Sequence, residues 1–316
     1  MKLNHILLVS QNFEKEQALF DWTLALAQQQ QATISVLCVL PEISPGLVGW
    51  LKNYMPSDVM AQQTQEALAA RHAWGLKANQ VGVNLTTHIA FGKPFYKAIQ
   101  MVLKNEIDFV VKQTDEPESS LSRYVFGSQD LHLLRKCPCP VLLHKQQAEL
   151  PFKRIMASVD VDIEAENLTP NRLNQTLLDC ALMMTQSNQA DLTIAHAWQA
   201  EAENLVRYWN SDMAEADVLR FSEDVQRQHA AAVEYEIQAV REAKPDIKVL
   251  LPKGRAAQAI PHVAETNAID LLVMGTLGRS GLSGLVIGNT AETILEQIQC
   301  SVLAVKPQGF VSPITV

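Results

Sequence analysis

The same order of sequence signals occurs twice along this chain, and this internal repeat limits the possible folds more than any other feature. A short apolar run after a polar or basic residue opens both halves, at residues 5–10 and 154–160. Later in each half, the pattern Asn-x-Ile-Asp is followed by another apolar run. Segments that match between the halves are 105–111 with 267–273, 34–40 with 192–198, 91–94 with 252–255, and 137–145 with 299–306. Because order and spacing agree over both halves, we interpret the chain as two copies of one domain.

Each copy predicts an α/β domain built on a parallel sheet. The apolar runs are short and continuous, as in strands buried on both faces, and amphipathic helical patterns separate them. Right-handed crossovers between such strands give a doubly wound, five-stranded parallel sheet. The polar segment 146–151 separates the copies, so we expect domains at residues 1–148 and 149–316. In this architecture, ligands bind at the carboxyl ends of the strands, where the strand order reverses.

Charge and hydropathy argue against several classes of protein. The chain of 316 residues has a formal net charge of -8 and no dense run of Lys or Arg, and a phosphate backbone would be repelled overall. We therefore expect no nucleic-acid partner. No stretch approaches the roughly 18 apolar residues of a membrane span, and the first apolar run is too short for a signal peptide. The five cysteines are scattered, as in reduced thiols of a cytoplasmic protein.

One cysteine cluster, Cys137-Pro138-Cys139-Pro140, interrupts this scattered pattern. Its C-x-C spacing lacks the second pair of ligands that a zinc site needs. A metal or redox role is the alternative. The favoured interpretation is a loop that leads into the strand at residues 141–143.

A glycine-rich segment at residues 275–290 is the most informative part of the sequence for function. Five glycines stand between Gly275 and Gly288, after an apolar strand and before a helical pattern. Glycine lets backbone amides approach an anion closely, and the first amides of a helix attract phosphate. The spacing is neither that of a Walker loop nor that of a dinucleotide-binding fingerprint. The segment predicts a phosphate site, with a glycine-rich turn that binds nothing as the alternative.

Gly275, Gly278 and Gly288 follow the spacing G-x2-G-x9-G, and by this motif the segment resembles the universal stress protein family. The resemblance covers nearly the whole chain twice over and is closest to the tandem type of the family. It implies two adenine nucleotide alpha hydrolase-like domains and a stress-response protein that binds ATP, with Mg²⁺ as the cation expected beside the phosphates. Family members pair their last strands, so the two copies are expected to form a pseudo-dimer within one chain, and a further homodimer is possible.

The resemblance also implies a role for each residue of the site. Asp160 ends the first strand of the second copy and would lie near ribose or a phosphate-bound Mg²⁺, with a helix cap or turn as its equally weighted alternative. The region of His196 and the side chain of Met274 would face the base, with no acid–base role for the histidine. The glycine amides would hold phosphates. The full implied ligand set is Asp160, His196, Met274, Gly275, Gly278, Arg279, Gly288, Asn289 and Thr290.

Both copies depart from the family motif. In the second copy, Asn289 replaces the Ser or Thr after the last glycine, and the hydroxyl moves to Thr290. In the first copy, Gln113 and Glu116 stand where the first two glycines would be, Gln11 replaces the carboxylate of Asp160, and only Gly127-Ser128 survives. Nearby carboxylates repel phosphate. We predict that the first copy does not bind ATP.

Two other functions compete with a nucleotide-binding regulator. Apolar side chains follow the second strand of each copy. Those of the first copy fall on one helical face, at Leu47, Trp50, Leu51, Tyr54 and Met55. The corresponding segment of the second copy has Leu205, Trp209, Met213, Val218, Leu219 and Phe221. They most simply cover the sheets or the contact between the two copies, but they also allow a scaffold protein or one that accepts a hydrophobic ligand. A weak ATPase is the third possibility, although no motif for a catalytic nucleophile or a metalloprotease is present.

Overall fold

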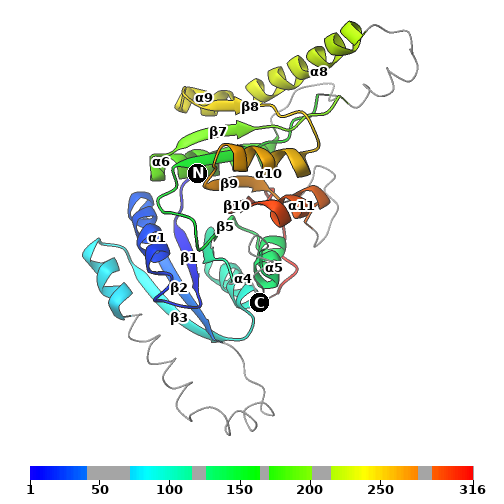
Figure 1. Ribbon diagram of the computed structural model, residues 1–316. Helices are drawn as coiled ribbons and strands as arrows, with labels where there is room; N and C mark the ends of the chain where they lie inside the picture. Colours follow the sequence, from blue (N-terminus) through cyan, green and yellow to red (C-terminus); the bar gives the residue numbers. More distant parts are fainter. Residues whose placement is uncertain (41–71, 116–125, 164–170, 201–214, 277–286, 316) are drawn as a thin grey trace. The chain divides into compact units, whose positions relative to one another are not determined.

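The computed structural model of the chain describes residues 1–40, 72–115, 126–163, 171–200, 215–276 and 287–315 (Figure 1). Contacts divide the chain into two compact units. The N-terminal unit comprises the described residues from Lys2 to Pro151 together with the tail from Phe310 onward, and the C-terminal unit comprises Met1 together with the described residues of Phe152–Gly309. The sequence predicts a boundary between two domains at residues 148 and 149, and this boundary stays a prediction. None of the described helices is long and apolar enough to cross a membrane.

The N-terminal unit contains a five-stranded parallel sheet in the order β3-β2-β1-β4-β5. Its strands are β1 (His5–Ser10), β2 (Thr33–Leu40), β3 (Leu85–Phe91), β4 (Phe109–Gln113) and β5 (Val141–His144). The helices that alternate with them are α1 (Gln17–Gln30), α4 (Pro94–Asn105) and α5 (Ser128–Lys136), and residues 72–80 are helical as well.

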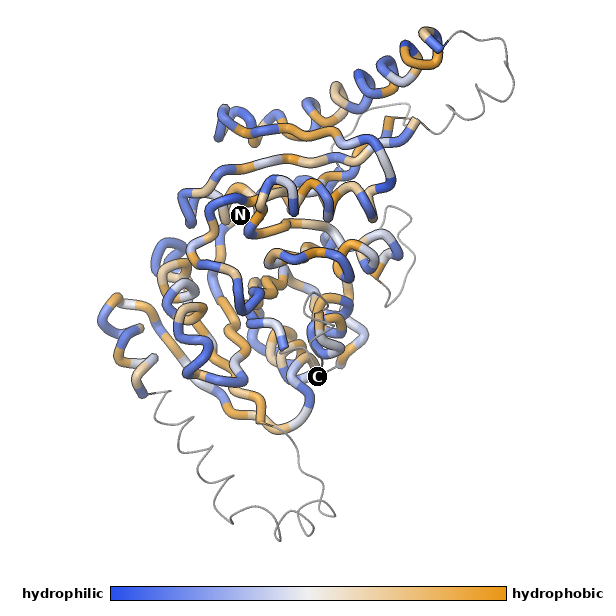
Figure 2. The backbone as a smooth tube through the Cα atoms, viewed as in Figure 1, coloured by the Kyte–Doolittle hydropathy of each residue, from blue (hydrophilic) through white to orange (hydrophobic). Residues whose placement is uncertain are grey.

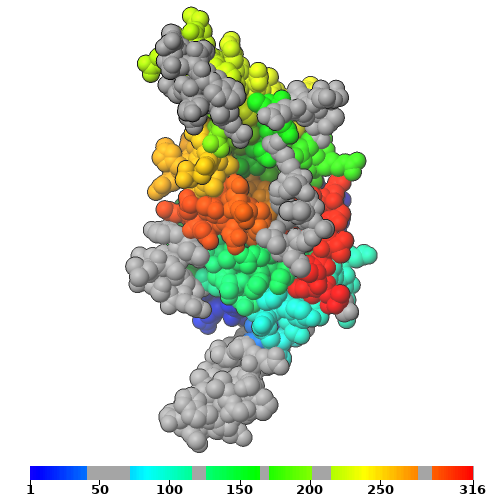
Figure 3. Space-filling view, turned by 90° about the vertical axis from the view of Figure 1, so that its right-hand side faces the viewer, coloured from blue at the N-terminus to red at the C-terminus, as the bar shows by residue number. Residues whose placement is uncertain are grey.

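The C-terminal unit repeats this topology in the order β8-β7-β6-β9-β10. Its strands are β6 (Arg154–Ser158), β7 (Asp191–Ala195), β8 (Lys248–Leu250), β9 (Leu271–Gly275) and β10 (Ser301–Val305). Its helices are α6 (Arg172–Asn188), α8 (Glu215–Glu236), α9 (Gln238–Ala243), α10 (Ala256–Thr266) and α11 (Asn289–Gln297). Helices α10 and α11 pack beside each other (Figure 3). The predicted α/β fold with two parallel-sheet copies is confirmed.

Burial of the strands on both faces explains why the sheets are stable. The central strands are mainly apolar along their length, as Figure 2 shows, and β1 and β9 are buried at nearly every position. In the N-terminal unit, Trp74 stacks on Phe20 of α1 with ring centroids 4.1 Å apart, and its indole N–H donates to the Gln17 side chain. Apolar contacts of this kind supply most of the free energy that holds helices to a sheet.

Helices α1 and α6 occupy the same place in the two units and end in the same way. Each is followed by a glutamine in the left-handed conformation, Gln31 after α1 and Gln189 after α6, whose backbone N–H bonds back to the helix. Counting back from these caps, Glu16 in the N-terminal unit corresponds to Asn174 in the C-terminal unit. This correspondence matters for the site, because both residues contact the end of the first strand.

Candidate functional site

The strand order of the C-terminal unit reverses between β6 and β9, and several of the described residues among those predicted for the site lie at this point. Ser158 of β6 pairs with Met274 of β9 on one side and with Ala195 of β7 on the other. The carboxyl ends of these three parallel strands therefore lie at one edge of the sheet. Asp160, His196 and Gly275 come from three neighbouring strand ends, as expected for a doubly wound domain.

Asp160 presents an exposed side chain on a fixed backbone. The Asn174 side chain of α6 donates from Nδ2 to the Asp160 carbonyl oxygen at 2.8 Å and accepts from the Asp160 N–H at 3.3 Å. Asn174 itself is buried. These two hydrogen bonds fix the direction in which the chain leaves β6, and the carboxylate stays accessible at the sheet edge.

A second pair of contacts joins the start of α6 to the end of α8. The Asn171 side chain accepts from the Leu173 N–H at 2.9 Å and so caps α6. The Asn171 N–H donates to the Glu236 carboxylate at 3.1 Å. Burial raises the pKa of Glu236, although its hydrogen bonds to Asn171 and Asn174 oppose the shift. Sequence reasoning missed these residues, and only the Asn-x-Leu start of α6 gave a signal for a cap.

Gly275 has a packing role at the end of β9. A Cβ atom built on Gly275 would lie 3.0 Å from Cδ2 of Leu173 on α6. The absence of a side chain therefore lets α6 approach the strand end closely. This contact accounts for the first motif glycine without a ligand, and leaves open a backbone contact to phosphate as a second role.

The next residue, Thr276, links β9 to two other parts of the site. Its buried hydroxyl accepts from Nζ of Lys306 at 2.6 Å, and Lys306 follows β10. Its carbonyl oxygen accepts from the Gly288 N–H at 3.0 Å. Thr276 therefore contacts both a nearly buried ammonium group and Gly288, the residue before the first residue of α11. Lys306 was seen in the sequence only as part of the repeated last strand.

Helix α11 begins at Asn289, with Gly288 as its N-cap and no side-chain hydrogen bond to the cap among the described residues. The first helical hydrogen bond runs from the Glu292 N–H to the Gly288 carbonyl oxygen. Because the Gly288 amide donates to Thr276, it is engaged within the protein and is a poorer phosphate ligand than predicted. The amides of Asn289 and Thr290, both exposed residues of the first turn, have the position that attracts anions.

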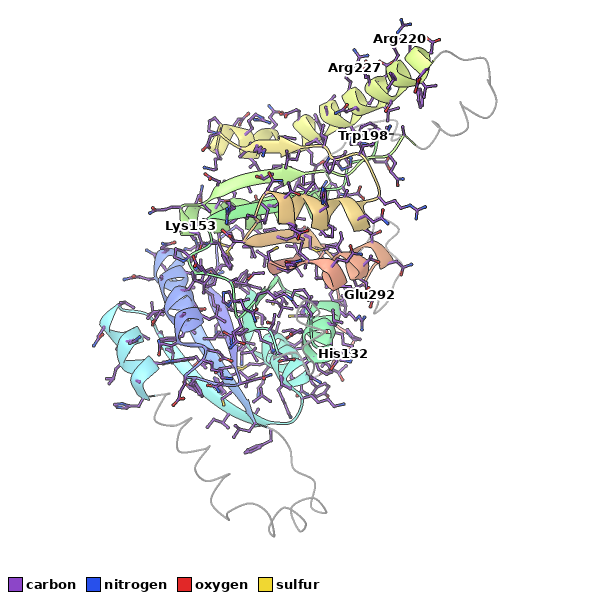
Figure 4. All side chains as sticks on the ribbon, in the orientation of Figure 1. His132, Lys153, Trp198, Arg220, Arg227 and Glu292 are labelled. Atoms are coloured by element: carbon purple, nitrogen blue, oxygen red, sulfur yellow. The ribbon has the colours of Figure 1, made fainter. Side chains whose placement is uncertain are left out.

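His196 and Met274 lie in the interior. Met274 is buried within β9. Both ring nitrogens of His196 contact protein atoms: Nδ1 is 3.2 Å from the Val159 carbonyl oxygen, and Nε2 is 2.9 Å from Nδ1 of His229 on α8. Trp198, labelled in Figure 4, lies next to His229 with ring centroids 6.0 Å apart. The histidine therefore helps to attach α8 to the sheet, and its contact with a base stays a prediction.

Part of the predicted site lies outside the described residues. Gly278 and Arg279 belong to residues 277–286, and Glu116 of the first copy belongs to residues 116–125. The apolar positions at Leu47–Met55, and at Leu205, Trp209 and Met213, also lie outside. The three described apolar positions of the second segment differ: Val218 is buried, Phe221 is half-buried and Leu219 is 58% exposed.

The same edge of the N-terminal unit contains an ion cluster of three residues. Lys112, which stands in β4 where Met274 stands in β9, is 2% exposed. Its Nζ lies 2.5 Å from Oδ1 of Asp115 and 2.7 Å from Oδ1 of Asp130, a fully buried residue of α5. Burial alone would lower the pKa of Lys112, but the two carboxylates outweigh burial and raise it. Burial raises the pKa of Asp130, against the effect of Lys112.

Asp115 fills the point where the strand order reverses in the N-terminal unit. Its Oδ1 accepts from Nε2 of Gln11 at 3.1 Å, so the ends of β1 and β4 are bridged. A Cβ atom built on Gly127, the N-cap of α5, would lie 3.0 Å from Oδ2 of Asp115. The carboxylate therefore packs against the helix start that corresponds to Gly288 and α11. In the N-terminal unit, the Asp115 carboxylate thus occupies the position beside the helix start that an external anion could take in the C-terminal unit.

The universal stress protein family model matches residues 2–145 and 152–306, one match in each half. The chain belongs to this family, as the glycine spacing and the repeat indicated. It is 29% identical over 272 residues to Universal stress protein E of Salmonella typhi, covering 84% of this chain and 83% of that protein. It is 27% identical over 315 residues to the Universal stress protein E homolog of Haemophilus influenzae, covering 97% and 98%.

Solved structures with the same fold span nearly the whole chain. A universal stress protein from Archaeoglobus fulgidus aligns with a TM-score of 0.65 at 14% identity, covering 97% of this chain and 100% of that one. A functionally unknown protein from Pseudomonas aeruginosa aligns with a TM-score of 0.66 at 21% identity, covering 96% and 93%. At these identities, the likeness shows the fold alone.

Proposed function

We propose that the C-terminal unit binds an adenine nucleotide as a regulatory ligand in a stress response. The observation that carries this proposal is the start of α11. Asn289 and Thr290 are exposed there, and Lys306 donates a hydrogen bond to the nearby Thr276 hydroxyl. A helix N-terminus beside a cation favours phosphate on electrostatic grounds. The glycine spacing at Gly275, Gly278 and Gly288 supports the same ligand.

ATP with Mg²⁺ is the form of the ligand that suits the exposed carboxylate of Asp160. Magnesium in nucleotide sites is held by one or two carboxylates together with the phosphates. Among the residues that the structure describes, no group of three or more His, Cys, Asp or Glu side chains could hold a metal ion by itself. The ion would therefore arrive with the nucleotide, and Asp160 would be its protein ligand.

The role proposed for the nucleotide is that of a signal, in a cytoplasmic protein whose thiols are reduced in the resting state. The expected pairing of the last strands into a pseudo-dimer and a further homodimer remain predictions. A non-nucleotide ligand remains the competing proposal, which the apolar positions before and within α8 motivate.

A charge placed at the start of α11 tests the nucleotide proposal without endangering the fold. Asn289→Asp adds a carboxylate at a helix start, where acidic residues are favourable for folding but repel phosphate. We expect the change to weaken ATP binding by about tenfold or more, or roughly 1.4 kcal/mol. Titration calorimetry with Mg²⁺-ATP measures the effect, and adenosine, which has no phosphate, should be affected far less.

Ser128→Asp is the matched control, because Ser128 is the first residue of α5 and is exposed like Asn289. It adds the same charge to the N-terminal unit and should leave ATP binding unchanged. Absence of binding by the unmodified chain at millimolar ATP would contradict the proposal. Equal loss of affinity in both variants would mean that the phosphates do not lie at α11.

A further inference from the structure

The short connection between α5 and β5 brings two thiol groups together in the N-terminal unit. Cys137 caps the end of α5 and is fully buried, whereas Cys139, two residues later, is half-buried. Their sulfur atoms are 3.6 Å apart. The two thiols therefore face each other, and Cys139 is the residue of the pair that keeps partial exposure to solvent, although its thiol group is buried.

The geometry of this connection favours closure into a ring. A disulfide requires a sulfur separation of about 2.05 Å, so the two atoms would have to approach by roughly 1.5 Å. Pro138 and Pro140 alternate with the cysteines and fix their own backbone φ angles. A connection restrained in this way loses little conformational entropy when the sulfurs join.

We propose that Cys137 and Cys139 form a reversible oxidation site that closes to an intrachain disulfide. The oxidant is a low-molecular-weight disulfide such as oxidised glutathione. The Cys139 thiolate attacks one sulfur of the oxidant and releases one thiol molecule. Cys137 then attacks Sγ of Cys139 and releases the second. Two protein thiols are oxidised, one external disulfide is reduced to two thiols, and the two protein protons end on the released thiols.

The reduced form is the resting state of this pair. The hydrogen bond with Cys137 and then burial raise the pKa of Cys139 well above the value of an ordinary thiol. A protonated thiol is a poor nucleophile, so the site reacts slowly and only under sustained oxidation. The corresponding connection of the C-terminal unit has Cys300 in the place of Cys139 but Ile298 in the place of Cys137, so it cannot close.

Peptide mapping of the full-length chain tests the proposal directly. The folded protein is incubated with oxidised glutathione, quenched in acid, alkylated and digested with trypsin. Cleavage after Lys136 and Lys145 releases residues 137–145, which contain both cysteines and no others. We expect this peptide to escape alkylation, to lose the mass of two hydrogens, and to regain two alkylatable thiols after reduction.

Three variants sharpen the result. Cys300→Ser should leave closure unchanged, and Cys137→Ser should trap a glutathione adduct on Cys139. Cys139→Ser should leave the buried Cys137 unmodified, which keeps the test meaningful if Cys137→Ser folds poorly. Two alkylatable thiols in the 137–145 peptide of the chain without substitutions, under conditions that oxidise free dithiothreitol, overturn the proposal. A lasting glutathione adduct on Cys139 beside an unreacted Cys137 overturns it as well.

Discussion

The two units have the same strand order, but the charges at the end of their fourth strand differ. In the N-terminal unit, Lys112 is neutralised by Asp115 and Asp130, and Asp115 reaches Gln11 across the point where the strand order reverses. In the C-terminal unit, uncharged Met274 and Ala291 correspond to Lys112 and Asp130, and the cation nearby is Lys306. The same backbone therefore supports an internally satisfied edge in one copy and an edge suited to an external anion in the other.

The contrast extends to the residue that steadies the end of the first strand. In the N-terminal unit, Glu16 accepts from the backbone N–H groups of Gln11 and Asn12 at 3.1 and 3.3 Å. At the corresponding position of the C-terminal unit, neutral Asn174 binds both the N–H and the carbonyl group of Asp160. A buried carboxylate here adds to the negative charge of the N-terminal edge. Burial raises the pKa of Glu16, against several hydrogen bonds and the charge of Lys112.

The largest effect is expected from removing the cation of the N-terminal cluster. Lys112→Met installs the residue of the C-terminal unit and leaves the fully buried Asp130 without its ammonium partner. Because an unpaired buried charge is strongly unfavourable, we expect a loss of roughly 3–5 kcal/mol in the free energy of unfolding. Urea denaturation followed by circular dichroism measures the loss.

The double change Lys112→Met with Asp130→Ala completes the comparison, because Ala291 is the counterpart of Asp130 in α11. Removing both charges should recover most of the lost stability. If the double variant is as unstable as Lys112→Met alone, the cost arises from packing and the ion pairs are not its cause.

A smaller effect is expected from acid at the last strand of the N-terminal unit. Burial lowers the pKa of His144 to about 4, against a weaker effect of its hydrogen bond to the Ala148 carbonyl oxygen. The pKa of His144 is lower in the folded state than in the unfolded state. Its contribution to the free energy of unfolding is therefore fully present above the unfolded value of about 6.5 and is lost as the pH falls towards 4.

When the pH is lowered from about 7.5 to about 5, this histidine should reduce the free energy of unfolding by about 2 kcal/mol. His144→Val introduces the residue found at the end of β10, Val305, and should remove that part of the pH dependence. Urea denaturation of both proteins at both pH values isolates the contribution, since the raised pKa values of Glu16 and Asp130 act in both. Identical pH slopes would show that His144 is not the group that titrates.

The smallest effects distinguish two glycines that have different neighbours. Gly127→Ala presses a methyl group on the Asp115 carboxylate, which is held by Lys112, and we expect a loss of about 1–2 kcal/mol. Gly275→Ala meets only the end of the Leu173 side chain, which can rotate away, and should cost less than about 1 kcal/mol. Thermal unfolding compares the two, and a larger loss for Gly275→Ala would mean that Leu173 cannot move.

The repeat in the sequence predicted most of the fold, because buried parallel strands leave continuous apolar runs and helices leave a different period. The same strand pattern also predicts that Asp160 and Gly275 lie at one edge of the sheet. The sequence pattern does not reveal Asp130 as a partner of Lys112, since Asp130 lies 18 residues away and its burial depends on how α5 packs. The sequence predicts that the region of His196 faces the base, but it gives no sign that the ring also contacts His229, because no local pattern specifies the position of α8.

The ion cluster of the N-terminal unit also makes the divergence of the two copies difficult to reverse by stepwise mutation. A lineage that lost Lys112 first would leave two carboxylates without their cation, and one that lost Asp130 first would leave the buried ammonium group with a single carboxylate partner. Each intermediate would sacrifice a large part of an ordinary margin of stability. Selection for a stable fold alone would therefore keep this copy from regaining a phosphate site, even where a second site was advantageous.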